Sequence, residues 1–501
     1  MALKATVIGF YDSMGDSSVD YCLKQTKLET MFVSAAYLKK MLDMRENNMA
    51  QFIRNIILFD SDQSTQAQTE RAQSLGINVM SLDAVREEGR GASANVEIDT
   101  SSLARDDIYM LNYTSGTTGD SKGVKISHWG VLSSATIYME LSTMTREDVL
   151  IDYLPAPHVF DQFMFIAAMI CGASQGYYQG NPLKLAEDCQ MLQPTFFPSV
   201  PRLYNKFYEK IKSTFDAATG CKAWLINRGL SSKQYGLTQQ NTASYSSGCY
   251  DMLVFGKVAK LLGGRVRRMI TASAPISKDV LELMKIAFSC PVMEAYGLSE
   301  TSGAVTVTDV DDPISGTVGG PIKHTAIKLK DLPDMDYRIT DKPYPRGEIC
   351  IRSPCVTPGY FMRPDKTAEA IDAQGYLHTG DVGVVYPNGA IKILDRCKNI
   401  FKLSQGEYVA PEKVENILVQ SNYIQQIMVY GHSLESVCVA ILVPSKDALA
   451  QWCQENGKDM ATVFQTQDAD FIKVLMEEIN QLGTLRKLNS LEKPKALYIT
   501  D

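Results

Sequence analysis

One stretch of the chain combines hydroxyl side chains, glycines and a lysine: residues 113–124 read YTSGTTGDSKGV. The apolar run before it, residues 108–113, predicts a buried strand. Small residues let backbone N–H groups close around an anion, and Ser and Thr side chains donate further hydrogen bonds. The spacing of the glycines and Lys122 differs from that of a Walker P-loop. The stretch therefore predicts another type of phosphate-binding loop, with a flexible Ser/Thr/Gly turn as the alternative.

Strand-like apolar runs alternate with segments of helical period as far as residue 295. Within residues 131–141, for example, Val131, Ala135 and Tyr138 recur at intervals of about one helical turn. This alternation predicts an α/β sheet with helices on its faces and ligand loops at the carboxyl ends of its strands. The predicted strands are residues 6–10, 56–59, 77–80, 108–113, 149–154, 269–272 and 292–295.

The pattern changes towards the carboxyl end of the chain. Residues 327–351 contain short strand-like runs broken by prolines and a glycine, which predicts a small β subdomain. Further on, Pro411 opens a predicted helix with an apolar face. The sequence thus predicts a large α/β domain over residues 1–395, with the β subdomain, and a small mobile α+β domain over residues 396–501.

Composition limits the classes of protein that fit. The chain has 501 residues and a net charge of −7, which offers no basic surface for nucleic acid. Its eleven cysteines include no Cys-x-x-Cys pair, so the pattern favours reduced thiols over disulfides or zinc. The longest apolar stretch, residues 163–173, is too short to cross a bilayer and predicts a buried helix. We expect an intracellular protein, cytoplasmic or peripheral on an organelle membrane.

Further motifs follow the first in a fixed order. Three long ones read PTFFPSVPRLYNKFYEKI, GYLHTGDVGVVYPNG and IFKLSQGEYVAPEKVENI, and shorter ones read YLPAPHVF and EAYGLSE. With these motifs the chain resembles the adenylate-forming enzymes, and among them the long-chain fatty acid CoA ligases, from its first residues to its last. The resemblance implies activation of a fatty acid by ATP through an acyl-adenylate. It also implies ATP, Mg²⁺ and CoA as cofactor and substrates.

The resemblance implies a nucleotide site. Thr114 and Glu300 resemble the residues that flank Mg²⁺, Tyr296 the residue that packs on adenine, and Asp381 the carboxylate that accepts ribose hydroxyls. Arg396 matches a ribose or phosphate contact. On their own, Glu300 could be a solvated carboxylate and Asp381 a turn former. The other residues that the resemblance assigns to ATP or AMP are Ser115, Gly116, Thr117, Thr118, Gly119, Lys122, Gly297 and Ser299.

The resemblance also implies acyl and thioester sites. His158, followed by Val159 and Phe160, matches the family's residues beside the fatty acyl carboxylate and the tunnel entrance, with residues 196–201 bordering the tunnel. A hydrogen-bonded core histidine is the alternative. Lys402 matches the segment that approaches the active site for thioester formation, and an exposed loop lysine is its alternative. The expected catalytic residues are His158, Glu300 and Lys402.

The two ends of the chain depart from the family pattern. The first residues resemble a segment that lies well inside the family's large domain, and no lysine matches the family's closing lysine region. From these departures we expect weak adenylation and a protein partner that covers the missing amino-terminal segment. Two hypotheses follow: an acyl-CoA ligase, or a catalytically impaired homologue that serves as a structural subunit of a larger assembly.

Overall fold

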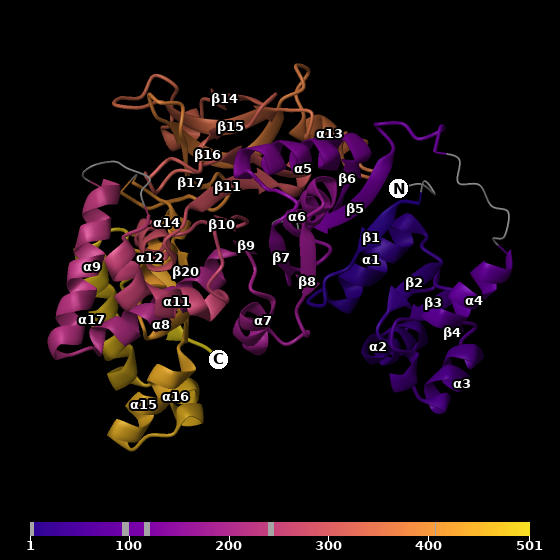
Figure 1. Cartoon of the computed structure of the whole chain (residues 1–501), viewed down its shortest axis with the longest axis horizontal. Coiled ribbons are helices and arrows are strands. Elements are labelled where there is room, and N and C mark those ends of the chain that lie inside the picture. Colours follow the sequence, from indigo (N-terminus) through magenta and orange to yellow (C-terminus); the bar gives the residue numbers. More distant parts are fainter. Residues whose placement is uncertain (1–4, 93–99, 115–120, 239–244, 406) are drawn as a thin grey trace. The chain divides into compact units, whose positions relative to one another are not determined.

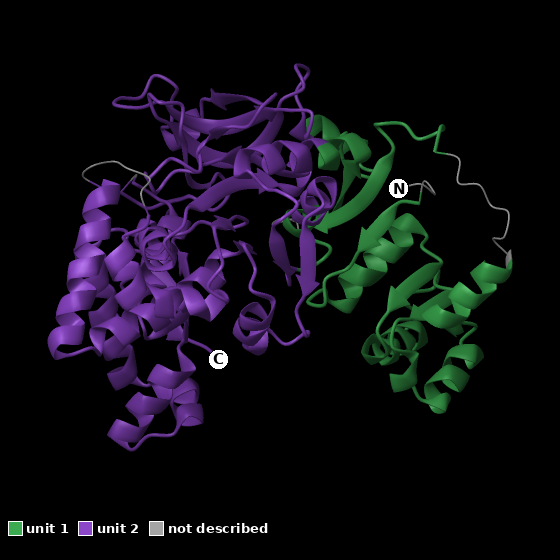
Figure 2. Ribbon diagram, viewed as in Figure 1, with its two compact units in different colours: residues 1–132, 155–162, 357–369 green, residues 133–154, 163–356, 370–501 purple. Residues whose placement is uncertain are grey.

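The structure is a computed structural model, and it divides into two compact units (Figure 2). Neither unit ends between residues 395 and 396, so the predicted domain boundary there stays a prediction. The described residues are 5–92, 100–114, 121–238, 245–405 and 407–501. Unit 1 holds residues 1–132, 155–162 and 357–369, and unit 2 holds residues 133–154, 163–356 and 370–501.

Unit 1 contains two three-stranded sheets. In the first, β2, β3 and β4 are all parallel, and apolar side chains of α2 such as Leu38 and Leu42 are fully buried against it. In the second, β5 pairs in parallel with β1 and antiparallel with β6. The elements are β1 (Val7–Gly9), α1 (Asp16–Thr26), β2 (Thr30–Val33), α2 (Ala35–Glu46), β3 (Asn55–Leu58), α3 (Gln66–Ser74), β4 (Asn78–Ser81), α4 (Leu82–Ala92), β5 (Ile108–Thr114) and β6 (Lys122–Ser127).

Unit 2 is built on a seven-stranded sheet in the order β13-β12-β11-β10-β9-β7-β8. The strands from β8 to β11 run parallel, and β12 and β13 add antiparallel at one edge. The predicted α/β class is confirmed. The strands are β7 (Val149–Asp152), β8 (Ser174–Tyr177), β9 (Phe196–Ser199), β10 (Arg268–Thr271), β11 (Val292–Leu298), β12 (Gly303–Val307) and β13 (Gly320–Pro321).

Helices α8, α9, α11 and α12 gather in one group within unit 2 (Figure 1). Helix α8 begins with Pro201, whose missing N–H costs nothing at a first helical position, and buries Tyr204, Phe207 and Ile211 on one stripe. The Tyr204 hydroxyl donates to the carbonyls of Phe197 and Ile270, 3.1 Å away in each case. The group comprises α8 (Pro201–Asp216), α9 (Gly220–Thr238), α11 (Gly256–Ala259) and α12 (Lys278–Phe288), with α7 (Leu185–Leu192) preceding it in the chain.

The predicted β subdomain is present as a four-stranded antiparallel sheet in the order β14-β15-β16-β17. Its core includes the fully buried side chains of Ile349 and Ile351. Its strands are β14 (Ala326–Lys330), β15 (Arg346–Arg352), β16 (Leu377–Val385) and β17 (Ile391–Arg396). Helix α13 (Pro364–Ala370) lies between β15 and β16 in the sequence.

The last part of unit 2 pairs a short sheet with helices. Strand β21 lies between β20 and β22. The helix predicted at Pro411 is confirmed, and its Val414 and Leu418 are fully buried. The elements are β18 (Phe401–Lys402), β19 (Tyr408–Val409), α14 (Pro411–Leu418), β20 (Ile424–Tyr430), β21 (Val439–Pro444), α15 (Lys446–Asn456), α16 (Met460–Thr466), α17 (Ala469–Leu485) and β22 (Leu497–Ile499).

Two helices, α5 (His128–Ser142) and α6 (Val159–Cys171), have residues in both units. The apolar stretch predicted as a helix is α6, with Phe163 buried but Met169 and Ile170 exposed. Among the helices of the described residues, none combines the length and apolar character that a membrane crossing needs. All eleven cysteines carry free thiols.

Candidate nucleotide and acyl sites

A hydrogen-bonded group in unit 2 joins three of the residues predicted to bind nucleotide. The hydroxyl of Tyr296, on β11, donates to Oδ2 of Asp381, on β16, over 2.6 Å. Arg396 is the cross-strand partner of Asp381, and its Nε lies 3.4 Å from Oδ1 of that carboxylate. Residues distant in sequence therefore meet at a buried carboxylate on β16.

Burial controls the electrostatics of this group. Only 3% of Asp381 is exposed, and this loss of solvent raises the pKa of its carboxyl. The positive charge of Arg396 lowers that pKa, whereas the negative charge of Glu300 raises it further. Burial also raises the pKa of Tyr296 well above its usual value, so its hydroxyl keeps its proton. A carboxylate in such surroundings is a strong hydrogen-bond acceptor because little water competes for it.

The backbone beside Tyr296 is tightly constrained. The pairing of β11 with β12 shifts register after Tyr296, and a Cβ on Gly297 would lie 2.0 Å from the carbonyl oxygen of Gly303. The turn that follows, Ser299–Thr301, is held by Thr301, whose hydroxyl donates to that same oxygen over 2.7 Å. Only glycine fits at Gly297, and the turn that carries Ser299 and Glu300 has a fixed path.

In unit 1, the predicted phosphate loop joins β5 to β6. Thr114 ends β5 and pairs directly with Lys122, the first residue of β6. The Lys122 ammonium lies 5.1 Å from the ring centre of Tyr360, within cation–π range. Ser115, Gly116, Thr117, Thr118 and Gly119 lie outside the described residues.

His158 lies in unit 1, directly before the first residue of α6. Its Nδ1 accepts a hydrogen bond from the backbone N–H of Phe160 over 3.1 Å, and burial lowers the pKa of the imidazole. The ring is therefore neutral at pH 7, with its proton on Nε2. Val159 and Phe160 are buried. This arrangement suits a histidine that borders an apolar space better than one that carries a permanent charge.

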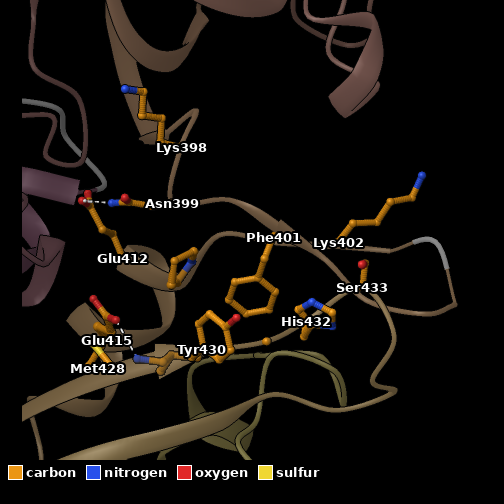
Figure 3. A pocket seen from close by; sticks show the side chains of 13 residues that line it. Lys398, Asn399, Phe401, Lys402, Glu412, Glu415, Met428, Tyr430, His432 and Ser433 are labelled. Atoms are coloured by element: carbon orange, nitrogen blue, oxygen red, sulfur yellow. Dashed lines mark hydrogen bonds between the residues drawn. The ribbon is translucent and has the colours of Figure 1, made fainter. Parts of the chain in front are cut away.

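Lys402 lies on the rim of a cavity of about 620 Å³ in the last part of unit 2 (Figure 3). Its ammonium is 5.0 Å from the ring centre of Tyr408. In the close-up, the rings of Phe401 and Tyr430 lie beside each other, with centroids 6.3 Å apart. The other lining residues are Lys398, Asn399, Pro411, Glu412, Glu415, Met428, Val429, Gly431, His432 and Ser433.

One buried carboxyl, Asp395, and two half-buried ones, Glu412 and Glu415, lie near this cavity and were not predicted as functional. Burial, together with the charge of Glu412, raises the pKa of Asp395 to about 7. Asp395 accepts the backbone N–H groups of Arg396, over 2.7 Å, and of Glu412, over 2.9 Å. Burial also raises the pKa of Glu412 and of Glu415. Glu412 accepts a hydrogen bond from the side chain of Asn399, and Glu415 accepts one from the backbone N–H of Val429 (Figure 3). The motif IFKLSQGEYVAPEKVENI contains Glu412 and Glu415, but a carboxylate in a sequence gives no sign of burial.

Comparison with protein families gives a match to "AMP-binding enzyme" over residues 1–361. The chain belongs to the AMP-binding enzyme family. This AMP-binding enzyme is 34% identical to long-chain-fatty-acid–CoA ligase 1 from Homo sapiens, over 99% of its own length and 70% of the ligase. It is also 34% identical to the peroxisomal long chain acyl-CoA synthetase 7 from Arabidopsis thaliana, over 98% of its length and 69% of the synthetase. The resemblance to the long-chain fatty acid CoA ligases is confirmed.

Solved structures share the fold of this AMP-binding enzyme. The adenylation domain of a carboxylate reductase from Mycobacterium chelonae superposes with a TM-score of 0.79 at 24% identity, over 98% of this chain and 71% of that one. ATP-bound MatB from Rhodopseudomonas palustris superposes with a TM-score of 0.62 at 20% identity, over 99% of this chain and 80% of that one. These similarities establish the adenylate-forming fold. The roles of individual residues are argued from the geometry of the site.

Proposed function

We propose that this chain converts long-chain fatty acids to acyl-CoA with ATP, through an acyl-adenylate. The observation that carries the proposal is the hydrogen bond of Tyr296 to the buried carboxylate of Asp381, in a chain 34% identical to a long-chain-fatty-acid–CoA ligase over 99% of its length. The alternative role, a structural subunit of a larger assembly, has no support among the relatives.

ATP would be held by its ribose and base in this proposal. Asp381 accepts hydrogen bonds from ribose hydroxyls, and Arg396, 3.4 Å away, helps to keep the carboxylate ionised. Tyr296 offers a ring face to adenine while its hydroxyl fixes the orientation of Asp381. A Cβ on Gly297 would lie 2.0 Å from the carbonyl oxygen of Gly303, so glycine at this position preserves the path of the turn that carries Glu300, the residue proposed to face the phosphates.

The phosphates need cations and donors. Mg²⁺ supplies charge neutralisation when bound, and the hydroxyl of Thr114 and the carboxylate of Glu300 are hard oxygen ligands that suit it. The ammonium of Lys122 stays close to the negative charge of the pyrophosphate as it leaves. An oxygen of the fatty acid carboxylate attacks the α-phosphorus, pyrophosphate leaves, and the acyl-adenylate forms; positioning and electrostatic stabilisation supply the catalysis. His158 borders the acyl carboxylate. Because its ring is neutral, it forms no ion pair that would slow the attack of the carboxylate on the α-phosphorus.

The thioester forms in a second step. The thiol of CoA loses its proton to solvent, its sulfur attacks the acyl carbonyl carbon, and AMP leaves with the electron pair of the broken C–O bond. Lys402 stabilises the charge that moves onto the departing phosphate. The exposed ammonium and its position on the rim of the cavity leave it free to approach such a substrate.

The proposed function predicts a preference for long acids. With ATP, Mg²⁺ and CoA, the purified chain is expected to produce AMP, pyrophosphate and palmitoyl-CoA from palmitate. Each methylene buried in an apolar channel adds about 0.8 kcal/mol, so kcat/KM should rise about fourfold per methylene until the channel is full. Rates measured over an even-numbered series from acetate to palmitate test this. Faster use of acetate or benzoate than of palmitate would contradict the acyl specificity.

The substitution Lys402→Ala is expected to slow thioester formation about tenfold and to leave adenylation unchanged. The reason is the loss of one charged hydrogen-bond donor, worth about 1.5 kcal/mol, in the second step alone. Single-turnover assays separate the steps as pyrophosphate release and consumption of pre-formed palmitoyl-adenylate by CoA. Lys398→Ala, on the same cavity, is the matched control. An equal loss in both steps would show that Lys402 does not act selectively.

A further inference from the structure

Three potential metal ligands meet where β15 pairs with β16 in the four-stranded sheet. Cys350 and His378 are direct cross-strand partners, with Sγ 3.5 Å from Nδ1. Oε2 of Glu348 lies 3.0 Å from the same Nδ1. All three ligand atoms fall within 4.8 Å of one another, so a single ion could contact each of them.

The strand geometry explains why these side chains converge. Glu348 and Cys350 are two residues apart on β15 and therefore share a face of the sheet. The register of β15 with β16 shifts between them, which is the signature of a bulge that re-aims side chains. The fully buried Cys350 and the nearly buried Glu348 are thereby brought against the partly exposed ring of His378.

The ligand set and spacing select the kind of ion. A tetrahedral zinc site has bonds of about 2.0–2.3 Å, which places neighbouring ligand atoms about 3.3–3.6 Å apart. The Sγ–Nδ1 distance of 3.5 Å fits this spacing, and the Oε2–Nδ1 distance of 3.0 Å needs a small expansion. One sulfur, one nitrogen and one oxygen suit a borderline-soft divalent ion, whereas Mg²⁺ and Ca²⁺ prefer oxygen ligands.

A second layer of contacts supports this ligand arrangement. Nε2 of His378 lies 3.7 Å from Oδ2 of Asp372, so a histidine bound to metal through Nδ1 would turn its remaining N–H towards a carboxylate. Oε1 of Glu348 accepts the backbone N–H of Gly380 over 3.1 Å, which leaves Oε2 for the ion. Asp372 is itself fixed by the backbone N–H of Tyr376 over 2.9 Å.

The charges around the cluster are compatible with a divalent ion. Lys330 lies 4.0 Å from Glu348, and Lys328 lies 3.0 Å from Asp372. A thiolate and a carboxylate together neutralise the ion, so the site is uncharged overall and these ammonium groups do not oppose it.

We propose that Glu348, Cys350 and His378 bind one divalent transition metal of the zinc class, with water in the fourth position. None of these three residues is a proposed Mg²⁺ ligand. His378 lies on β16, three residues before Asp381.

Cobalt(II) is the probe that tests this site, because a bound thiolate gives Co²⁺ a charge-transfer absorption band and a tetrahedral site gives it strong visible bands. Titration of the purified full chain with Co²⁺ is expected to produce both bands and to saturate at one equivalent, and Zn²⁺ should then abolish them. Wild-type chain that shows no thiolate band, or only octahedral cobalt spectra, would overturn the proposal.

Variants identify the ligands. Cys350→Ser is expected to remove the thiolate band, and His378→Ala to weaken cobalt binding at least tenfold. The double variant Cys221→Ser/Cys249→Ser removes two exposed thiols, and Cys355→Ser removes a buried one nearby, so both should keep the wild-type spectrum. Loss of the band in either control, or its retention in Cys350→Ser, would assign the metal elsewhere. If Cys350→Ser does not fold, the wild-type titration and the controls still decide.

Discussion

Replacing Asp381 by alanine is expected to weaken ATP binding by about 1–3 kcal/mol, which is about 5- to 150-fold in Kd. The carboxylate is the proposed acceptor of two ribose hydroxyls, and each lost hydrogen bond to a charged group contributes to this range. The substitution also leaves the hydroxyl of Tyr296 without its acceptor 2.6 Å away. Isothermal calorimetry with ATP and Mg²⁺ measures the change.

Two matched variants separate this effect from general damage. Asp341→Ala removes another carboxylate that pairs with an arginine of the same sheet, Arg346 at 2.7 Å, and should leave ATP binding unchanged. Tyr296→Phe keeps the ring and the carboxylate and removes one hydrogen bond, so its loss should be no more than about 1.5 kcal/mol. An Asp381→Ala variant that folds and binds ATP like wild type would reject the proposed ribose contact.

The substitution Glu294→Gln is expected to stabilise the protein at alkaline pH by an amount of the order of a few kcal/mol. Glu294 is buried on β11, and within the described residues its Oε2 has no hydrogen-bond partner. Burial raises the pKa of this carboxyl to about 8. Its neutral form fits the fold, and ionisation is the unfavourable state that glutamine cannot reach.

The direction of the pH dependence follows from this shift. Because the pKa is higher in the folded than in the unfolded state, the stability from neutral Glu294 is fully present below about pH 4.5 and is lost as the pH rises through about 8. The difference in unfolding free energy between variant and wild type should therefore grow over that interval. Asp395 titrates in both proteins, so its contribution cancels.

Urea unfolding of both proteins at about pH 5 and about pH 8.5 measures the growth of this difference. Glu282→Gln is the control, since Glu282 is also buried but has Lys278 as a partner at 3.5 Å. Parallel stability profiles for Glu294→Gln and wild type would mean that the carboxyl of Glu294 gains a compensating partner when it ionises.

The sequence predicted those strands whose apolar runs are long enough to stand out. β5 and β11 were found because strands whose side chains are mostly buried read as nearly continuous apolar segments. β2 was not predicted although it is as long as the predicted β3, and β12 begins at Gly303, whose φ of 130° permits a close approach to Ser134 and Phe163. Glycine is an unfavourable strand residue outside such contacts, so the start of β12 was not recognisable from the sequence.

The candidate sites were predicted unevenly for a related reason. Residue types and motif order identified Tyr296, Asp381 and Arg396, but only the pairing of β16 with β17 places Asp381 opposite Arg396. The raised pKa of Glu294 depends on burial that no sequence pattern reveals. The Glu348, Cys350 and His378 cluster escaped because its ligands come from two antiparallel strands, whereas spacing rules for zinc search for pairs of neighbouring cysteines.

The hydrogen bond from the backbone of Glu412 to Asp395 ties the start of helix α14 to the end of strand β17. Helix α14 has eight residues, too few to be stable alone, and Ala410 at its start offers no side-chain cap. The carboxyl of Asp395, at the end of β17, supplies the missing acceptor over 2.9 Å. The first turn of α14 therefore gains its side-chain cap only where the end of β17 is in place, so the helix and the four-stranded sheet support each other in the folded chain.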